Sequence, residues 1–453
     1  MKKKIDLAKS EFPIARTYQE FTSNASASGI VLIICTMIAM IWANSPWWES
    51  YFELWHTHFI IGIGDFTLDK SLHHWINDLL MVVFFFLVGL EIKREILIGE
   101  LSSLRKAMLP IMGALGGILV PATIYTLFNL GTDNLHGWAI PMATDIAFAL
   151  GVLYLLGDRV PQSLKIFLAA LAIVDDIAAV VVIAVFYTST ISLHYLLLSF
   201  LFLFIMLVGN RLKVMSPLFY LAIGGLVWFT MLKSGVHATI AGVLTAFTIP
   251  SYALIDKQKF VENTEGLWRK FRSKLFQTKT DFLTEYEADA LYNMDLLSDK
   301  VQPLLLRLER GIDEYVSYLI MPLFALSNAG IHFENFYLGA LINPVTTGVF
   351  AGLFIGKQIG VASFVWLANK FNIVSLQPGI PFRQYYYVAV LTGIGFTMSL
   401  FISALSFGPD APQEMYSKIG ILLGSIFAGT LGYILMRRDL NKQDKVKDEV
   451  AKS

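Results

Sequence analysis

The chain has 453 residues, of which 55% are hydrophobic and only 15% are charged, against roughly 25% charged residues in soluble domains. Its 35 Lys and Arg balance its 35 Asp and Glu, which argues against a nucleic-acid partner because such binders need a basic excess. The single cysteine, Cys35, excludes a disulfide framework and any CxxC metal or redox site. The mean hydropathy of +0.60 therefore predicts a membrane protein embedded in the lipid bilayer.

Apolar runs long enough to cross roughly 30 Å of hydrocarbon recur along most of the chain. There are twelve, near residues 27–44, 76–92, 107–129, 137–157, 164–187, 193–209, 216–233, 236–250, 312–330, 345–369, 385–407 and 417–436. They predict an all-α membrane protein with twelve transmembrane helices. The chain begins Met-Lys-Lys-Lys and continues with polar residues, so we expect no cleavable signal peptide.

The basic residues indicate the orientation. Twelve spans place both termini on one side, and 31 of the 35 Lys and Arg then fall on that side. Because short cytoplasmic loops accumulate Lys and Arg, we expect both termini in the cytoplasm. The predicted organisation is a cytoplasmic N-terminal segment (1–26), spans 1–8 (27–250), a charged cytoplasmic insertion leading into span 9 (251–310), spans 9–12 (311–436) and a cytoplasmic tail (437–453).

The insertion at 251–310 holds ten basic and ten acidic residues. Trp268, Phe271 and Leu275 are spaced for one helical face, with basic residues between them. This pattern suits a basic helix on the inner membrane surface. A solvated pair of cytoplasmic helices fits equally well, and a regulatory module is a third interpretation.

Four ionisable residues lie within the apolar runs: Asp145, Asp175, Asp176 and Lys357. A charge in mid-membrane costs several kcal/mol, so such residues face the protein interior and usually mark ion or proton paths. A single intramembrane Asp can also be a buried polar cap between helices. Two adjacent carboxylates suit that interpretation poorly because they repel each other.

Adjacent helical positions point about 100° apart, so Asp175 and Asp176 cannot face one small cavity in the same way. One can line an ion pathway while the other reaches a basic partner, and Lys357 is the only mid-membrane base for that. A buried carboxylate is stable when it is protonated or when a cation supplies the missing charge. Competition between proton and cation for the same oxygens predicts a cation/proton antiporter.

Two apolar runs are interrupted in a similar way. Pro141 and Thr144-Asp145 break the fourth run, and Gly393 and Gly395 break the eleventh; residues 144–148 read Thr-Asp-Ile-Ala-Phe and 392–396 read Thr-Gly-Ile-Gly-Phe. Interrupted spans in corresponding places of two halves point to a transporter's substrate site. The two runs are central in spans 3–5 and 10–12, which enter from opposite sides. This predicts inverted-topology repeats with two crossed, interrupted helices.

Crossed broken helices place half-helix ends in mid-membrane, positive at N-termini and negative at C-termini, with about half a charge each. Asp145 has the sign to offset the former and Lys357 the sign to offset the latter. Gly352, Gly356 and Gly360 repeat every four residues around Lys357. We interpret them as a smooth face for close helix packing.

Seven motifs resemble those of the NhaA-type sodium/proton antiporters of bacterial inner membranes. They are GLEIKRE at 89–95, PMATDIAFALGVL at 141–153, LAIVDDIAA at 171–179, SGVHAT at 234–239, LIMPLFALSNAG at 319–330, IGK at 355–357 and GIGFTMSLF at 393–401. They cover most of the chain in order and leave out mainly 251–300 and the tails. The resemblance implies a multi-pass inner-membrane transporter that exchanges Na⁺ or Li⁺ for H⁺, and a homodimer is a further expectation of the family.

The resemblance also implies roles for the membrane residues. Asp176 is expected to be the principal sodium ligand, and Asp175 either shares the ion or pairs with Lys357. Thr144 and Asp145 are expected at the unwound crossing, with Asp145 offsetting helix ends. Two carboxylates permit more than one proton per cation, so we expect electrogenic exchange driven by the membrane potential.

Four further positions match the family's motifs. Asp78 is expected to support the site, and Glu91 and Glu309 to lie at the cytoplasmic mouth and take part in pH sensing. His237 matches a family turn, although a structural loop histidine is the favoured interpretation.

The sequence also departs from the family pattern. Arg310 and Asp313 stand where the family often carries histidines. Because histidine is the natural switch near neutral pH, the family's pH profile is not carried over to this chain. The segment at 251–300 is longer than the corresponding family connection.

Other transport and enzyme classes fit less well. An organic-anion/sodium symporter of related fold is the main alternative, but its substrate calls for a basic cavity. An intramembrane aspartyl protease needs a GxGD-type motif, and a passive channel needs no titrating dyad. Residues 352–357 are one residue short of a P-loop and lie in an apolar run. No HExxH, nucleophile elbow or nucleotide fingerprint is present, so we expect no enzyme activity and no cofactor.

Overall fold

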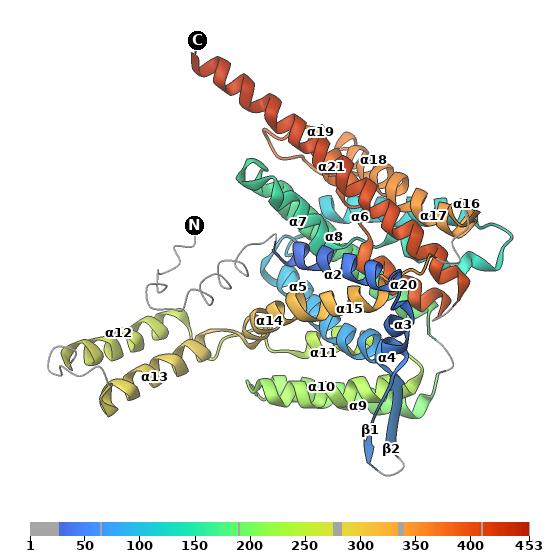
Figure 1. The fold of residues 1–453 in the computed structure, drawn as a ribbon. Helices are drawn as coiled ribbons and strands as arrows, with labels where there is room; N and C mark the ends of the chain where they lie inside the picture. The colour runs from blue at the N-terminus through green and yellow to red at the C-terminus, as the bar shows by residue number, and fades with distance from the viewer. Residues whose placement is uncertain are drawn as a thin grey trace. The chain divides into compact units, whose positions relative to one another are not determined.

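The computed structural model describes residues 27–63, 66–188, 191–274, 283–333, 339–408 and 411–452 (Figure 1). The described chain divides into two compact units that alternate along the sequence. Unit 1 comprises Met1–Phe84, Glu95–Ser189 and Glu314–Ser453, and unit 2 comprises Phe85–Arg94 and Thr190–Asp313. Helices α5 (Met81–Ile98) and α14 (Leu304–Tyr315) contribute residues to both units.

Unit 1 is helical apart from one hairpin. Its elements are α2 (Ala27–Ala43), α3 (Trp48–His56), β1 (His58–Ile63), β2 (Phe66–Ser71), α4 (Leu72–Trp75), η1 (Ile76–Leu80), α6 (Leu104–Phe128), η2 (Asp133–Met142), α7 (Ile146–Leu155), η3 (Gly157–Arg159), α8 (Gln162–Phe186), η4 (Val316–Ile320), α15 (Met321–Asn328), α16 (Gly339–Ile342), α17 (Pro344–Ala351), η5 (Gly352–Gly356), α18 (Lys357–Lys370), α19 (Phe382–Leu391), α20 (Phe396–Phe407) and α21 (Pro412–Lys452). Unit 2 adds α9 (Leu193–Arg211), α10 (Pro217–Ser234), α11 (Thr239–Thr248), α12 (Lys257–Lys274) and α13 (Glu285–Val301).

The helices confirm a multi-pass, predominantly helical membrane protein. Within the described residues, eight helices are long and apolar enough to cross a membrane, and two bent helix pairs raise this to ten. Each of the twelve apolar runs coincides with a helical segment, but the eighth contains only the ten-residue α11. Twelve spans therefore stay a prediction.

A β-hairpin between α3 and α4 lies outside the helical pattern. Strands β1 and β2 pair antiparallel, from His58 opposite Ser71 to Ile63 opposite Phe66. The indole N–H of Trp75 donates to the Phe59 carbonyl over 2.9 Å. Hydropathy misses this element because it is too short to span and carries polar residues.

Glycines bring α6 and α18 into direct backbone contact. A Cβ added to Gly116 would lie 2.1 Å from the Gly360 carbonyl oxygen, and one added to Gly360 would lie 2.1 Å from the Gly116 carbonyl oxygen. Gly352 and Gly356 face prolines of η2 and α6 at similarly short range. The glycine repeat around Lys357 is therefore a packing face, as predicted.

Three segments of unit 1 are π-helical: η1, η4 and η5. Such bulges occur frequently at functional sites because they displace the helix register by one residue. Segment η5 ends immediately before Lys357, and η1 contains Asp78. Two of the site positions predicted from sequence thus lie in or next to a π bulge.

The C-terminal part of α21 contacts two separate segments of unit 1. Arg159, after α7, donates to Asn441 over 2.6 Å and to Asp444 over 2.7 Å. Arg383, at the start of α19, pairs with Asp439 over 2.7 Å. Helix α21 therefore connects the end of α7 to the beginning of α19.

Unit 2 has its own apolar core, formed where α9, α10 and α11 pack together. Met206, Tyr220 and Val227 are fully buried there. Helix α10 ends at Gly235, whose φ of +84° is left-handed and suits glycine. Tight packing of these three helices gives unit 2 a core independent of unit 1.

The charged insertion forms two helices of unit 2, α12 and α13, which pack against each other. Within α12 the rings of Trp268 and Phe271 stack 5.9 Å apart. A capping box between Thr284 and Glu287 fixes the start of α13. Leu275, the third residue of the predicted apolar face, lies outside the described residues, as do residues 1–26.

Candidate functional site

The two interrupted segments meet at their breaks. The first runs from η2 to α7 through extended backbone at residues 143–145, and the second bends by 47° between α19 and α20. The backbone N–H of Asp145 donates to the Ile394 carbonyl over 2.7 Å. The Thr144 hydroxyl lies 3.0 Å from the Thr392 carbonyl. Polar groups that each helix leaves unsatisfied at its break are thus satisfied by the other.

The carboxylate of Asp145 caps both half-helices. Its Oδ1 accepts from the backbone N–H of Phe148 in α7 over 3.0 Å. Its Oδ2 accepts from the backbone N–H of Thr397 in α20 over 3.1 Å and from the Thr397 hydroxyl. The side chain is buried, with 1% exposed. The side chain therefore contacts the N-termini of two helices, where a negative charge is favourable.

Glycines allow this close approach. A Cβ added to Gly393 would lie 2.5 Å from the Leu353 carbonyl oxygen, and one added to Gly395 would lie 3.0 Å from the Ala143 carbonyl oxygen. A side chain at Gly393 would press on the backbone of η5, and one at Gly395 would press on η5 and on the backbone of the first break. The two glycines of the second break are therefore steric requirements of the crossing as well as helix breakers.

Helix α8 carries Asp175 and Asp176 next to this crossing, and both are buried, with 1% and 2% exposed. Lys357 Nζ lies 2.5 Å from Asp175 Oδ2, and neither side chain has any exposed surface. The Thr144 hydroxyl lies 2.8 Å from the same Asp175 oxygen. The other oxygen, Asp175 Oδ1, makes no hydrogen bond with the described residues.

The Lys357 side chain passes close to Gly117, a residue without a side chain. A Cβ added to Gly117 of α6 would lie 3.3 Å from Lys357 Nζ. A larger residue there would crowd the ammonium group. The ion pair links α18 to α8, and loss of either partner would leave the other as an uncompensated buried charge.

The structure brings five of the site residues predicted from sequence close together and places the other four elsewhere. Thr144, Asp145, Asp175 and Lys357 are linked by the contacts above, and Asp176 is next to Asp175 in α8. Asp78 is half-buried in η1 of unit 1, with no contact to the dyad among those described.

The remaining three predicted residues belong to unit 2. Glu91 is half-buried on α5. Glu309 of α14 accepts from Arg94 Nε over 2.8 Å, with 15% of its side chain exposed. His237 lies in the turn before α11, with Nδ1 3.1 Å from the Thr239 hydroxyl. That local contact fits the structural interpretation of His237.

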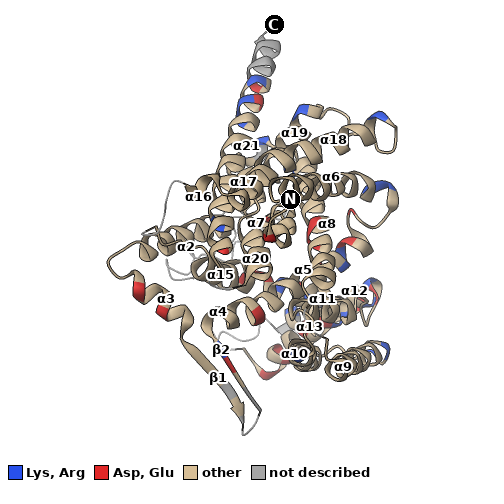
Figure 2. Cartoon of the chain, turned by 90° about the vertical axis from the view of Figure 1, so that its right-hand side faces the viewer, with Lys and Arg blue, Asp and Glu red and all other residues tan. Residues whose placement is uncertain are grey.

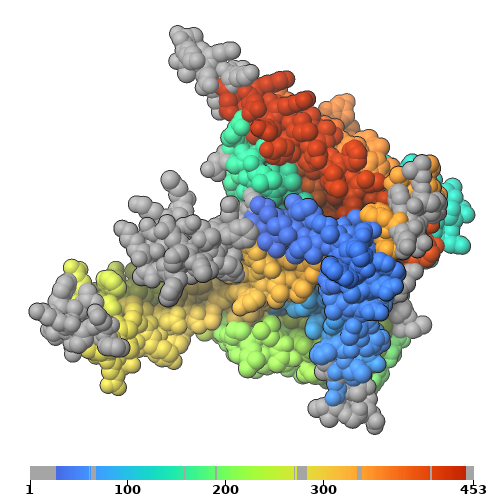
Figure 3. All heavy atoms as spheres, viewed as in Figure 1, coloured from blue at the N-terminus to red at the C-terminus, as the bar shows by residue number. Residues whose placement is uncertain are grey.

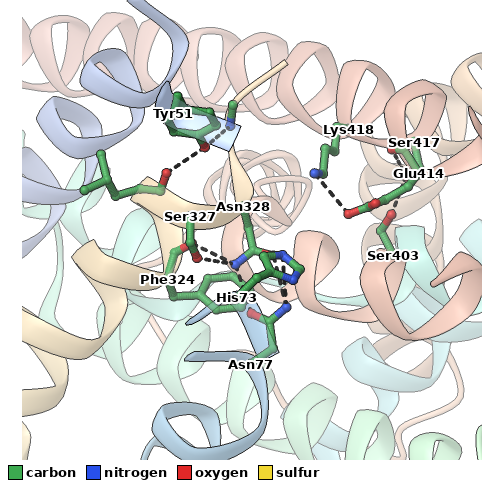
Figure 4. Close-up of polar contacts among 12 residues, drawn as sticks. Tyr51, His73, Asn77, Phe324, Ser327, Asn328, Ser403, Glu414, Ser417 and Lys418 are labelled. Carbon is green, nitrogen blue, oxygen red and sulfur yellow. Dashed lines mark hydrogen bonds and ion pairs between the residues drawn. The ribbon is translucent and has the colours of Figure 1, made fainter. Parts of the chain in front are cut away.

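A neutral polar cluster in unit 1 escaped the sequence analysis (Figure 4). His73 Nε2 lies 3.1 Å from Asn328 Oδ1, and the Asn328 amide donates to Asn77 Oδ1 over 3.0 Å and to the Ser327 hydroxyl over 2.8 Å. Asn328 has no exposed surface. The available signal was a pair of amides within apolar runs, Asn77 beside Asp78 and Asn328 within LIMPLFALSNAG.

A buried ion pair is drawn in the same view: Lys418 Nζ lies 3.0 Å from Glu414 Oε1 within α21 (Figure 4). Within the described part of the chain, no three acidic, His or Cys side chains are arranged to hold one metal ion together.

Comparison with known proteins gives one consistent result. A model of the family described as Na+/H+ antiporter 1 matches residues 19–436. The chain is similar to a protein named Na(+)/H(+) antiporter NhaA from Koribacter versatilis, with 48% identity over 93% of this chain and 91% of that protein. A protein of the same name from Oleidesulfovibrio alaskensis is 46% identical over 93% of both chains, and one from Wolinella succinogenes is 45% identical over 92% of both. With its interrupted segments joined beside a buried acidic pair, the chain belongs to the Na+/H+ antiporter 1 family.

Proposed function

We propose that this chain exchanges Na⁺ for H⁺ across the bacterial inner membrane, with Asp175 and Asp176 as the site for which the two ions compete. The observation that carries the proposal is the fully buried Lys357–Asp175 pair beside two interrupted segments. The printed names of the relatives, Na(+)/H(+) antiporter, support the same ions. The organic-anion symporter has no such support, and the acidic pair disfavours an anionic substrate.

The charges around the site suggest one bound cation at a time. The site has three carboxyl groups, those of Asp145, Asp175 and Asp176, and one ammonium group, that of Lys357. Two helix N-termini of about half a positive charge each offset Asp145, and Lys357 offsets Asp175. One negative charge of the set is then balanced by Na⁺ or by a proton.

The competition follows from this balance. A state with neither ion leaves a net charge in low dielectric, which is unfavourable by several kcal/mol. Only the protonated and cation-bound states then reorient between the two sides of the membrane, so each passage of Na⁺ one way is matched by H⁺ the other way. We propose Asp176 as the principal ligand, with Asp175 Oδ1 as a further oxygen.

The finer transport properties are part of the proposal. Li⁺ has the same charge and a preference for oxygen ligands, so we expect it to be exchanged too. The exchange becomes electrogenic when Asp175 leaves Lys357 and takes up a second proton beside that on Asp176, because two protons then pass for each cation. Asp78 supports the site from η1, and no cofactor takes part.

The proposed topology has twelve spans, with spans 3–5 and 10–12 as inverted repeats and both termini in the cytoplasm. The distribution of Lys and Arg among the loops supports it, and residues 251–310 are then cytoplasmic. We place Glu91 and Glu309 at the cytoplasmic mouth. Glu309 pairs there with Arg94, and both acids are proposed to take part in pH sensing. A homodimer completes the proposal.

The direct test is a proton-gradient assay in everted membrane vesicles that are energised to an acid interior. Addition of Na⁺ or Li⁺ should dissipate the gradient, and K⁺ serves as the comparison ion. Vesicles from cells without the protein control for leakage. Absence of any sodium response between pH 6 and 9, in vesicles that hold a gradient and contain the protein, would exclude the exchange.

A further inference from the structure

An apolar groove of about 460 Å³ opens on the surface of unit 1. Residues of α2, α7 and α21 line it, among them Met37, Val152 and Ile426. These three helices are visible together on one face in Figure 3, as blue, teal and red surfaces. Met37 and Ile426 are 51% and 62% exposed, so the groove is open sideways, toward the surroundings of the membrane-spanning helices.

The inner wall of the groove is the crossing itself. Phe148 of α7 and Phe396 of α20 both line it, and their rings meet edge to face at 5.4 Å. The backbone N–H of Phe396 donates to the hydroxyl of Ser425, another lining residue, over 3.2 Å. Anything in the groove therefore touches the first turns of both half-helices that Asp145 caps.

One end of the groove is basic. Gly429 and Tyr433 line it, and Arg437 follows at the same four-residue spacing, hence on the same face of α21. The Arg437 guanidinium lies over the Tyr433 ring, 5.9 Å from its centroid. Figure 2 shows Lys and Arg interspersed with Asp on this C-terminal part of α21. From Ser425 to Tyr433 the helix rises by about 12 Å, a length that suits an alkyl chain.

We propose that this groove binds one glycerophospholipid, with an acyl chain along α21 and the phosphate on Arg437. The apolar lining rejects a hydrated ion, and the groove opens where the spanning helices meet lipid. Guanidinium groups bind phosphate oxygens in a fork, and an aromatic ring beside an arginine is typical of the membrane interface. The chain end would contact Phe148 and Phe396, so the lipid supports the crossing.

Gly429 offers a way to fill the groove without deforming the protein. A Cβ added there would lie 3.4 Å from Ile394 Cδ1, which is ordinary contact. At Gly432, by comparison, a Cβ would lie 2.5 Å from Leu391 Cδ2. Gly429→Leu should therefore place its side chain where the acyl chain lies. Gly225→Leu is the matched control, because nothing lies within 4 Å of a Cβ there and the residue is on α10 of unit 2.

The experiment uses the purified full-length protein in liposomes that contain phosphatidylglycerol with a photoreactive diazirine near the end of one acyl chain. After irradiation, peptide mass spectrometry locates the label. We expect labelling around Met37 and Ile426 several-fold above that of the exposed helix α9. Gly429→Leu and Arg437→Ala should each lower this excess several-fold, while Gly225→Leu and Arg438→Ala leave it unchanged.

Two results would overturn the proposal. One is equal labelling of α2, α21 and α9, which means ordinary contact with the surrounding lipid. The other is excess labelling that persists in both Gly429→Leu and Arg437→Ala. Melting temperatures of the variants in detergent confirm that each is folded, and the readout does not depend on ion exchange.

Discussion

Two buried acidic regions of unit 1 satisfy their charges in opposite ways. At the crossing, both oxygens of Asp145 accept hydrogen bonds from backbone or hydroxyl donors of Phe148 and Thr397. On α8, one oxygen of Asp175 receives Lys357 and Thr144 while the other makes no hydrogen bond with the described residues.

The difference separates a fixed charge from an exchanging one. Donors held in the backbone cannot leave Asp145 without unwinding α7 or α20, so its charge is part of the fold. Asp175 on α8 depends on a flexible lysine and on a hydroxyl, which can rearrange while the helix stays intact. We therefore propose the pair on α8, and not Asp145, as the place where protons and cations exchange.

The largest expected effect comes from the exchanging region. Asp176→Asn removes one titrating group and one negative charge, so sodium-driven proton release in vesicles should be abolished while the protein still inserts and folds. Asp69→Asn, on the exposed hairpin, is the control and should behave like the parent chain. Retained exchange in Asp176→Asn would remove this residue from its proposed role.

The ion pair can be broken from its basic side. Lys357→Met leaves Asp175 buried without its cation, which should lower the free energy of unfolding by about 3–5 kcal/mol. The double variant Lys357→Met/Asp175→Asn should recover most of that loss because no charge is stranded. Denaturant titration in detergent measures both. If the single and double variants are equally destabilised, the pair is not what holds α18 to α8.

The fixed charge should matter for stability more than for turnover. Asp145→Asn keeps one acceptor but presents an amide to the other donors, and should cost about 1.5–3 kcal/mol. We expect a lower melting temperature with residual exchange, the reverse of the Asp176→Asn pattern. A variant that is fully stable yet inactive would show that Asp145 belongs with the exchanging region.

A substitution that removes a single hydroxyl tests the contribution of the crossing to stability on a smaller scale. Thr397→Val removes one hydroxyl donor from Asp145 and leaves the Thr397 backbone N–H, so about 1 kcal/mol should be lost. Thr123→Val is the matched control, because that hydroxyl bonds only within its own helix, to Leu119. The melting temperatures of the two variants give the comparison. An equal loss in both would mean that the crossing does not depend on this hydroxyl.

The smallest effect is expected from histidine. Since exchange is assigned to carboxylates and Arg310 and Asp313 replace the family's histidines, the pH response should survive replacement of all eight histidines. Vesicle assays over a range of pH values measure it. Loss of the response on replacing His237, or any other single histidine, would contradict this assignment.

The charged residues of the candidate site could be predicted from sequence because charges are rare within apolar runs. An ionisable residue in an apolar run is conspicuous, so Asp145, Asp175 and Asp176 could be selected from sequence. Lys357 was predicted as the basic partner because it is the only mid-membrane base, but the sequence left open whether Asp175 pairs with it. The breaks followed from residues that weaken helices, Thr144-Asp145 and the two glycines near 394.

Neutral partners were not predictable in the same way. Neutral polar residues lower the hydropathy of an apolar run only slightly and recur at no fixed spacing. Examples are Thr397, which donates to Asp145, and the amides Asn77 and Asn328. Their roles depend on which helices are neighbours, and that is a property of tertiary packing. The β-hairpin and the π segments escaped for a related reason, because local register changes leave no periodic signal.

The contacts of α21 with Arg159 and Arg383 give the two interrupted segments a common mechanical anchor. One follows α7 and the other begins α19, so the far ends of both segments are fastened to one straight helix. A rotation of either segment about the crossing would pull on α21 and through it on the other. The two interrupted segments are therefore connected at two places, directly at Asp145 and through α21 at their far ends.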